Sequence, residues 1–143
     1  MTLSRKAALG LVACTAGALV TGTAGAAHAD GSYFGAFATA DRGSSIHVVA
    51  MWNYPDQASA DAAALRDCGD ANCVIQLRWA DGCAAYSRRD DNLFWATGNT
   101  RAEAERNALA AAGPDPNPLL VSLGSAEPST ATVRTSACTA NAG

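Results

Sequence analysis

Lysine is almost absent from this sequence, and histidine is scarce. Lys6 is the only lysine, and beyond residue 29 every basic side chain is an arginine. Without Arg5 and Lys6 the chain keeps 8 basic residues against 13 acidic ones, a net charge of −5. An acidic chain with no basic run is poorly suited to nucleic acid or to anionic membrane surfaces, so neither is expected as a partner.

The sequence also has no apolar run that would comfortably span a bilayer. Its longest candidate, residues 7–20, is interrupted by glycine, follows the basic pair Arg5-Lys6 and precedes the small-residue site Ala27-His28-Ala29. This order predicts a signal peptide over residues 1–29, cleaved after Ala29, and a secreted protein with no membrane span. A lipoprotein site ending at Cys14 is a poorer reading, because only about six apolar residues would precede the cut.

The remaining residues, 30–143, have the length of a single small domain. Their cysteines are few but even in number, as expected of an exported chain with two disulfides: Cys68, Cys73, Cys83 and Cys138. Of the three possible pairings we favour Cys68–Cys73 with Cys83–Cys138, and we expect the second bond to tie the two halves of the domain together. The spacing lacks the Cys-x2-Cys pairs that structural zinc sites favour, so no metal or other cofactor is expected.

A capped, alanine-rich helix is predicted after Asp56 and ends at Gly69, with Ala58, Ala62 and Leu65 on its apolar stripe. A shift of 44 residues predicts a second helix from Thr100, with a capping box to Glu103, to Gly113. Alternating apolar residues predict the strands at residues 33–39, 46–52, 73–80, 84–87, 93–97 and 119–123, with an additional edge strand at 133–138.

These elements predict an α+β fold made of an internal repeat. Each copy is strand, strand, helix, strand, with repeat 1 over about 33–82 and repeat 2 over about 83–138. The expected architecture is one mixed or antiparallel sheet with both helices on one face, stapled by the disulfides.

Several short segments together resemble a known family. They are Tyr33–Ala36, Asn53–Pro55, Cys68-Gly69, Gly82-Cys83 and Thr100–Ala104. Their order is similar to that of domain-of-unknown-function family 4189, small secreted or lipid-anchored domains of actinobacteria and other bacteria. The resemblance covers about residues 33–113. It departs afterwards, where members tend to repeat Cys-Gly and this chain has Ala112-Gly113 and a proline-rich link. It implies no established activity and no catalytic residues.

The residues themselves offer little catalytic chemistry. His47 is the only histidine after residue 29, and although Ser44 and Ser45 lie close in sequence, no Gly-x-Ser-x-Gly elbow is present. An acidic group around the first disulfide, including Asp70 and Asp81, has calcium-type ligands but lacks a following bidentate glutamate. We therefore do not expect an enzyme, and a hydrolase built on His47 is the weakest hypothesis.

Aromatic residues near strand ends are the candidate interaction residues: Trp52, Tyr54 and Trp95. Such rings often mark protein contacts, and they also stack on sugars. Trp79 shares a face with Ile75 and Leu77 and is expected in the core. The sequence thus favours a non-catalytic protein-interaction module with an unknown protein partner, and the alternative is a module that binds carbohydrate or cell wall.

Overall fold

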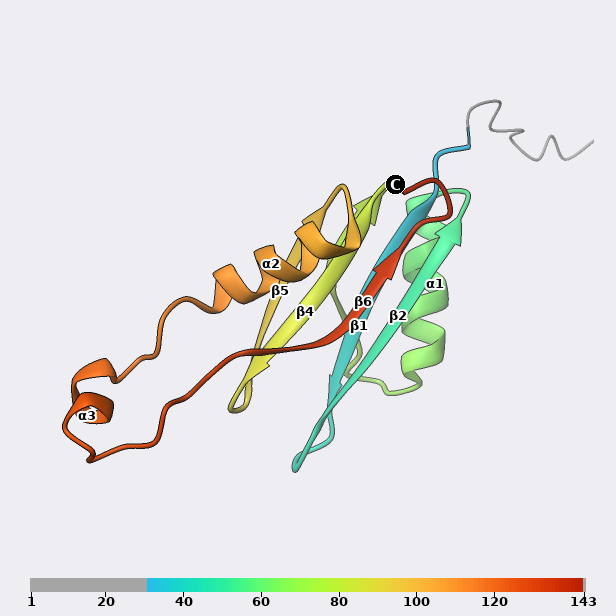
Figure 1. Ribbon diagram of the computed structural model, residues 1–143. Helices are drawn as coiled ribbons and strands as arrows, with labels where there is room; N and C mark the ends of the chain where they lie inside the picture. The colour runs from blue at the N-terminus through green and yellow to red at the C-terminus, as the bar shows by residue number, and fades with distance from the viewer. Residues whose placement is uncertain (1–30, 143) are drawn as a thin grey trace, which may run out of the picture.

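The computed structural model describes residues 31–142 (Figure 1). The predicted signal peptide and its cleavage site lie outside these residues. Within them, no helix combines the length and the apolar character that a membrane crossing requires.

The strands form two antiparallel sheets of three strands each, in which the first strand of each half is the central one. The first sheet has the order β2-β1-β3 and the second the order β5-β4-β6. The strand bounds are β1 Phe34–Asp41, β2 Ile46–Tyr54, β3 Val74–Ala80, β4 Cys83–Arg89, β5 Asn92–Gly98 and β6 Thr132–Cys138.

The predicted single sheet with both helices on one face is therefore wrong, although the α+β class is right. The two sheets stack face to face, and each carries its own helix on its outer side (Figure 1). Helix α1 (Gln57–Cys68) covers the first sheet and helix α2 (Arg101–Ala112) covers the second. The layers run helix, sheet, sheet, helix.

The size of the side chains explains this layering. Between each helix and its sheet the buried residues are mostly alanines, such as Ala36 with Ala60 in the first half and Ala85 with Ala104 in the second. Small side chains let a helix lie close to a sheet. Large rings gather instead between the two sheets, where Phe37 is fully buried. Burial of these apolar surfaces is the main force that joins the halves.

We call the rings between the sheets the aromatic layer: Phe37, Trp79, Tyr86 and Trp95. The centroid of the Phe37 ring lies 5.1 Å from that of Trp79 and 5.3 Å from that of Trp95. Gly35 makes room for this layer, because a Cβ at that position would lie 2.3 Å from the Trp79 ring. The core position predicted for Trp79 is thus confirmed.

Both helix starts and both disulfides are as predicted. The Asp56 side chain accepts from the Ser59 amide at 2.7 Å, and the Thr100 hydroxyl accepts from the Glu103 amide at 3.2 Å. The disulfides join Cys68 to Cys73 and Cys83 to Cys138.

The expectation that the second disulfide ties the two halves is wrong. Cys83 and Cys138 are register partners on β4 and β6, neighbouring strands of the second sheet. What joins the halves, besides the aromatic layer, is the chain after Cys138. The Ala140 amide donates to Asn53 Oδ1 at 2.7 Å, and the Asn141 side chain donates to Asp81 Oδ1 at 2.6 Å.

One predicted strand is a helix. Residues 119–123 were expected as the last strand of the second half, but helix α3 spans Pro118–Ser122, and β6 takes the sheet position beside β4. Proline fits the first turn of a helix, because its missing N–H would have no partner there.

Candidate interaction site

Residues 113–131, which we call the arm, leave the body between α2 and β6. The arm extends away from the stacked sheets and carries α3 at its end (Figure 1). Connections of this length are uncommon in small domains, and those that are ordered are often functional.

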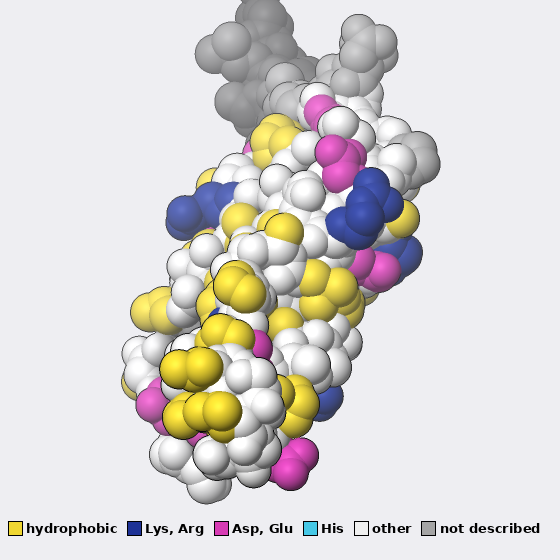
Figure 2. Space-filling view, turned by 60° about the vertical axis from the view of Figure 1, so that its left-hand side comes forward, with side chains coloured by type: hydrophobic (Ala, Val, Ile, Leu, Met, Phe, Trp, Pro, Cys, Tyr) yellow, Lys and Arg dark blue, Asp and Glu magenta, His cyan; other side chains and the backbone are white. Residues whose placement is uncertain are grey.

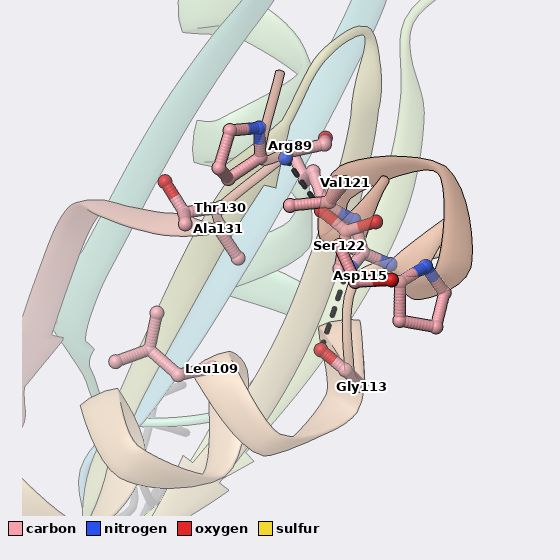
Figure 3. A pocket seen from close by; sticks show the side chains of 11 residues that line it. Arg89, Leu109, Gly113, Asp115, Val121, Ser122, Thr130 and Ala131 are labelled. Atoms are coloured by element: carbon pink, nitrogen blue, oxygen red, sulfur yellow. Dashed lines mark hydrogen bonds between the residues drawn. The ribbon is translucent and has the colours of Figure 1, made fainter. Parts of the chain in front are cut away.

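Arg89 fastens the arm to the body. This side chain reaches from the end of β4 to the last carbonyls of α2 and the first of the arm, donating to Gly113 at 3.1 Å, to Pro114 at 2.7 Å and also to Ala112 (Figure 3). A cation at a helix C-terminus is favoured by the helix dipole and satisfies carbonyls that have no partner within the helix.

The two legs of the arm are joined by Asp115. Its carboxylate accepts from the Asn117 amide on the outgoing leg at 2.7 Å and from the Ser129 amide on the returning leg at 2.6 Å. The Ser129 hydroxyl in turn donates to Asp90 in the turn between β4 and β5 at 2.8 Å. The arm is therefore held as a defined structure.

Between the arm and the body lies a hollow of about 520 Å³ (Figure 3). Val121 of α3, Ala131 of the returning leg and Leu109 of α2 line it, together with Arg89. Apolar side chains on one side of α3 thus already face the body.

The other side of α3 is apolar as well, but it faces outward. We call Leu119, Leu120 and Leu123 the leucine face. Their exposed fractions are 68%, 46% and 67%. Residues three or four positions apart share one side of a helix, so the three lie together. Figure 2, which brings the arm toward the viewer, shows hydrophobic side chains gathered at this end of the molecule.

Removing the Arg89 side chain should loosen the arm. We expect Arg89→Met, which keeps the apolar stem, to increase thermolysin cleavage within residues 113–131 by about 10-fold, because local opening governs proteolysis. Mass spectrometry of the fragments would locate the cuts. Arg106→Met, on the exposed side of α2, is the control and should leave the cleavage rate unchanged. Equal rates for the two variants would contradict the role given to Arg89.

The three aromatic residues predicted as interaction sites lie in different surroundings. Trp52 is 44% exposed near the end of β2. Tyr54 packs beside the alanine core under α1, and Trp95 belongs to the aromatic layer, 4.9 Å from Tyr86 between ring centroids. The structure does not bring the three rings onto one surface. The leucine face was not predicted as a site, because its residues were interpreted as a strand.

The groups considered for catalysis or metal binding are dispersed. In the described chain His47 makes no hydrogen bond to Ser44 or Ser45, and its Nδ1 is buried without a partner. Asp70 pairs with Arg42 at 2.8 Å, whereas Asp81 accepts a hydrogen bond from the Asn141 side chain at 2.6 Å. Among the described residues, no group of three or more His, Cys, Asp or Glu side chains is placed to hold a metal ion.

The Asp81 carboxyl accepts several hydrogen bonds close to the start of the described chain. Hydrogen bonds from the Asn141 side chain first, and then from the Tyr33 backbone and Ser32, lower the pKa of this carboxyl below its ordinary value. Because the folded state favours the ionised carboxylate, these hydrogen bonds contribute stability at pH values above the ordinary pKa of an aspartate. That contribution is lost as the pH falls through the lowered folded-state pKa.

The comparisons with known proteins agree with the resemblance seen in the short segments. The model of the family described as "Domain of unknown function (DUF4189)" matches residues 34–117, which is more than half of the chain. The match includes α1, α2 and five of the strands and ends where α3 begins. No curated protein and no solved structure matches the chain. The protein is therefore a member of the DUF4189 family.

Proposed function

We propose that this protein is an exported, non-catalytic protein-interaction module, and that the leucine face of the arm is its contact surface. Export is supported by the two disulfides, which persist in oxidising compartments, and by the signal-like order of residues 1–29. In each sheet the first strand of the half lies between the second and the third. This shared order supports an internal repeat as the scaffold that presents the arm.

The observation that carries this proposal is the exposure of three neighbouring leucines on an anchored arm. Each leucine that becomes fully buried gains roughly 2 kcal/mol, so leaving three of them in water has an appreciable cost. A clustered apolar patch on a soluble protein marks a contact site more often than a single exposed leucine does. Arg89 and Asp115 hold the arm in place, so little ordering entropy would be lost on binding.

Replacing the leucine face should remove binding without affecting the fold. We expect Leu119→Gln, Leu120→Gln and Leu123→Gln in one variant to weaken partner binding by at least about 100-fold, because buried anchors dominate interface energies. Its unfolding free energy should stay within about 1 kcal/mol of the wild type, because the side chains are exposed. Glutamine keeps the helix propensity of the segment.

The measurement is capture from culture supernatant and cell extract on immobilised residues 30–143, with bound proteins identified by mass spectrometry. Leu65→Gln is the matched control, because Leu65 is a 39% exposed leucine on α1, on the opposite outer layer. The control should capture the same proteins as the wild type. Capture that survives in the triple variant would exclude the arm as the contact surface.

Carbohydrate or cell-wall binding is the second candidate, and the exposed ring of Trp52 favours it. Tyr54 and Trp95 lie elsewhere, so Trp52 would act without the stacking partners proposed for it. This candidate requires that the mature protein co-sediments with purified wall or polysaccharide and that Trp52→Ala weakens the binding. Undiminished co-sedimentation of that variant would remove the candidate.

A further inference from the structure

The charged side chains of the arm itself are of one sign. The arm contains two carboxylates, Asp115 and Glu127, and no lysine or arginine. The bond from Ser129 to Asp90 brings the Asp90-Asp91 turn beside the arm, which adds two more carboxylates. Figure 2 shows acidic side chains close to the hydrophobic ones at this end of the molecule.

The neighbouring arginines neutralise only part of this charge. Arg88 pairs with Asp91 at 2.8 Å, and Arg89 is committed to the carbonyls at the base of the arm. None of the ion pairs between described residues includes Asp90, Asp115 or Glu127. The arm therefore combines the exposed leucine face with carboxylates and carries no cation of its own.

This acidic character of the arm restricts the kind of partner that it can bind. Two copies that met through their leucine faces would bring two acidic arms together, and an anionic membrane would repel the same carboxylates. A partner surface with cationic side chains around an apolar floor would instead bury the leucines and attract the carboxylates of the arm. The arrangement of Leu119, Leu120 and Leu123 is that of anchors on a short helix that lies in an apolar groove.

We propose that the arm binds a protein whose groove has an apolar floor and a rim of lysine or arginine side chains. This inference depends on the proposed function. The leucine face fills the groove. The carboxylates of the arm pair with the basic rim, which orients the arm in the groove and speeds the association of the two proteins.

The probe is the protein that the wild-type chain captures and the triple glutamine variant does not. Its affinity is measured for the wild type, Glu127→Lys and Asp67→Lys, each at 50 and 300 mM NaCl. Asp67 is an exposed carboxylate on α1, so its reversal makes the same charge change away from the arm. We expect Glu127→Lys to weaken binding by about 3- to 10-fold at low salt and by less at high salt, and Asp67→Lys to leave it unchanged.

Two failures can be told apart. If Glu127→Lys binds as tightly as the wild type at both salt concentrations, the basic rim is wrong but arm-mediated binding stands. If no captured protein depends on the leucines, both proposals fall.

Two further results would also overturn the inference. One is a leucine-dependent dimer of the purified chain in sedimentation equilibrium. The other is leucine-dependent binding to vesicles that contain phosphatidylglycerol. Circular dichroism of every variant confirms that the fold is retained.

Discussion

Phe37→Ala is expected to lower the free energy of unfolding by about 3–5 kcal/mol. The ring is fully buried, and it contacts Trp79 from its own sheet as well as Tyr86 and Trp95 from the other. Its removal would leave a cavity where the two sheets meet. Domains of this size are stable by roughly 5–15 kcal/mol, so the loss is a large fraction of the total.

Urea titration followed by tryptophan fluorescence would measure the change, since two of the reporting rings lie in the aromatic layer. Val74→Ala is the control, because Val74 is 51% exposed on the neighbouring strand β3, and it should cost less than about 1 kcal/mol. Similar costs for Phe37→Ala and Val74→Ala would mean that the aromatic layer does not hold the two sheets together.

Replacing Cys83 and Cys138 together by alanine is also expected to lower the free energy of unfolding by a large amount. The cysteines are 55 positions apart, and on the chain-entropy estimate a closed loop of this size contributes about 4 kcal/mol. The bond crosses directly between β4 and β6, so its loss acts on the second sheet. Without it, the pairing of β6 with β4 depends on hydrogen bonds and packing alone.

The pair Cys68 and Cys73, only 5 positions apart, supplies the comparison. Its replacement by alanine should cost about 2 kcal/mol on the same estimate. Thermal unfolding of both double variants, followed by circular dichroism, gives the order of the two effects. A larger loss of stability on removal of the Cys68–Cys73 bond would contradict the prediction that the Cys83–Cys138 bond contributes more to the stability of the fold.

The features predicted correctly from the sequence are those set by near neighbours. A cap such as Asp56 needs only the amides of the next turn, and the left-handed Gly69 ends the same helix. The Cys68–Cys73 bond likewise closes a short loop beside a helix end, so the local pattern favours it. The Cys83–Cys138 bond spans 55 positions and was the favoured pairing among three, although it joins strands of one sheet rather than the two halves.

The features predicted wrongly depend on packing between distant segments. Alternation shows that a strand has an apolar face but does not show what covers it, and so it could not separate one sheet from two. In the alanine-rich helix α1, the sequence did not clearly distinguish the buried side from the exposed side. Leu65, placed on the buried stripe, is 39% exposed, whereas Ala60 and Ala64 are buried.

The candidate site was missed for a related reason, because the sequence pattern did not distinguish a helix from a strand. A short apolar run such as residues 119–123 fits a strand or a helix equally well, and only the proline before it favours the helix. Trp95 suggested an exposed contact residue because it lies near a strand end, but it faces the first sheet and packs against Phe37 there. The prolines on both sides of an apolar run in a polar linker were the available signal for the arm.

Hydrogen–deuterium exchange of residues 30–143, alone and with a protein that this chain captures, tests most directly whether the arm is the contact surface. We expect slower exchange on binding in residues 117–124, with β2 around Trp52 unchanged. Protection confined to β2, with the amides of the arm exchanging as fast as in the free protein, would contradict the account.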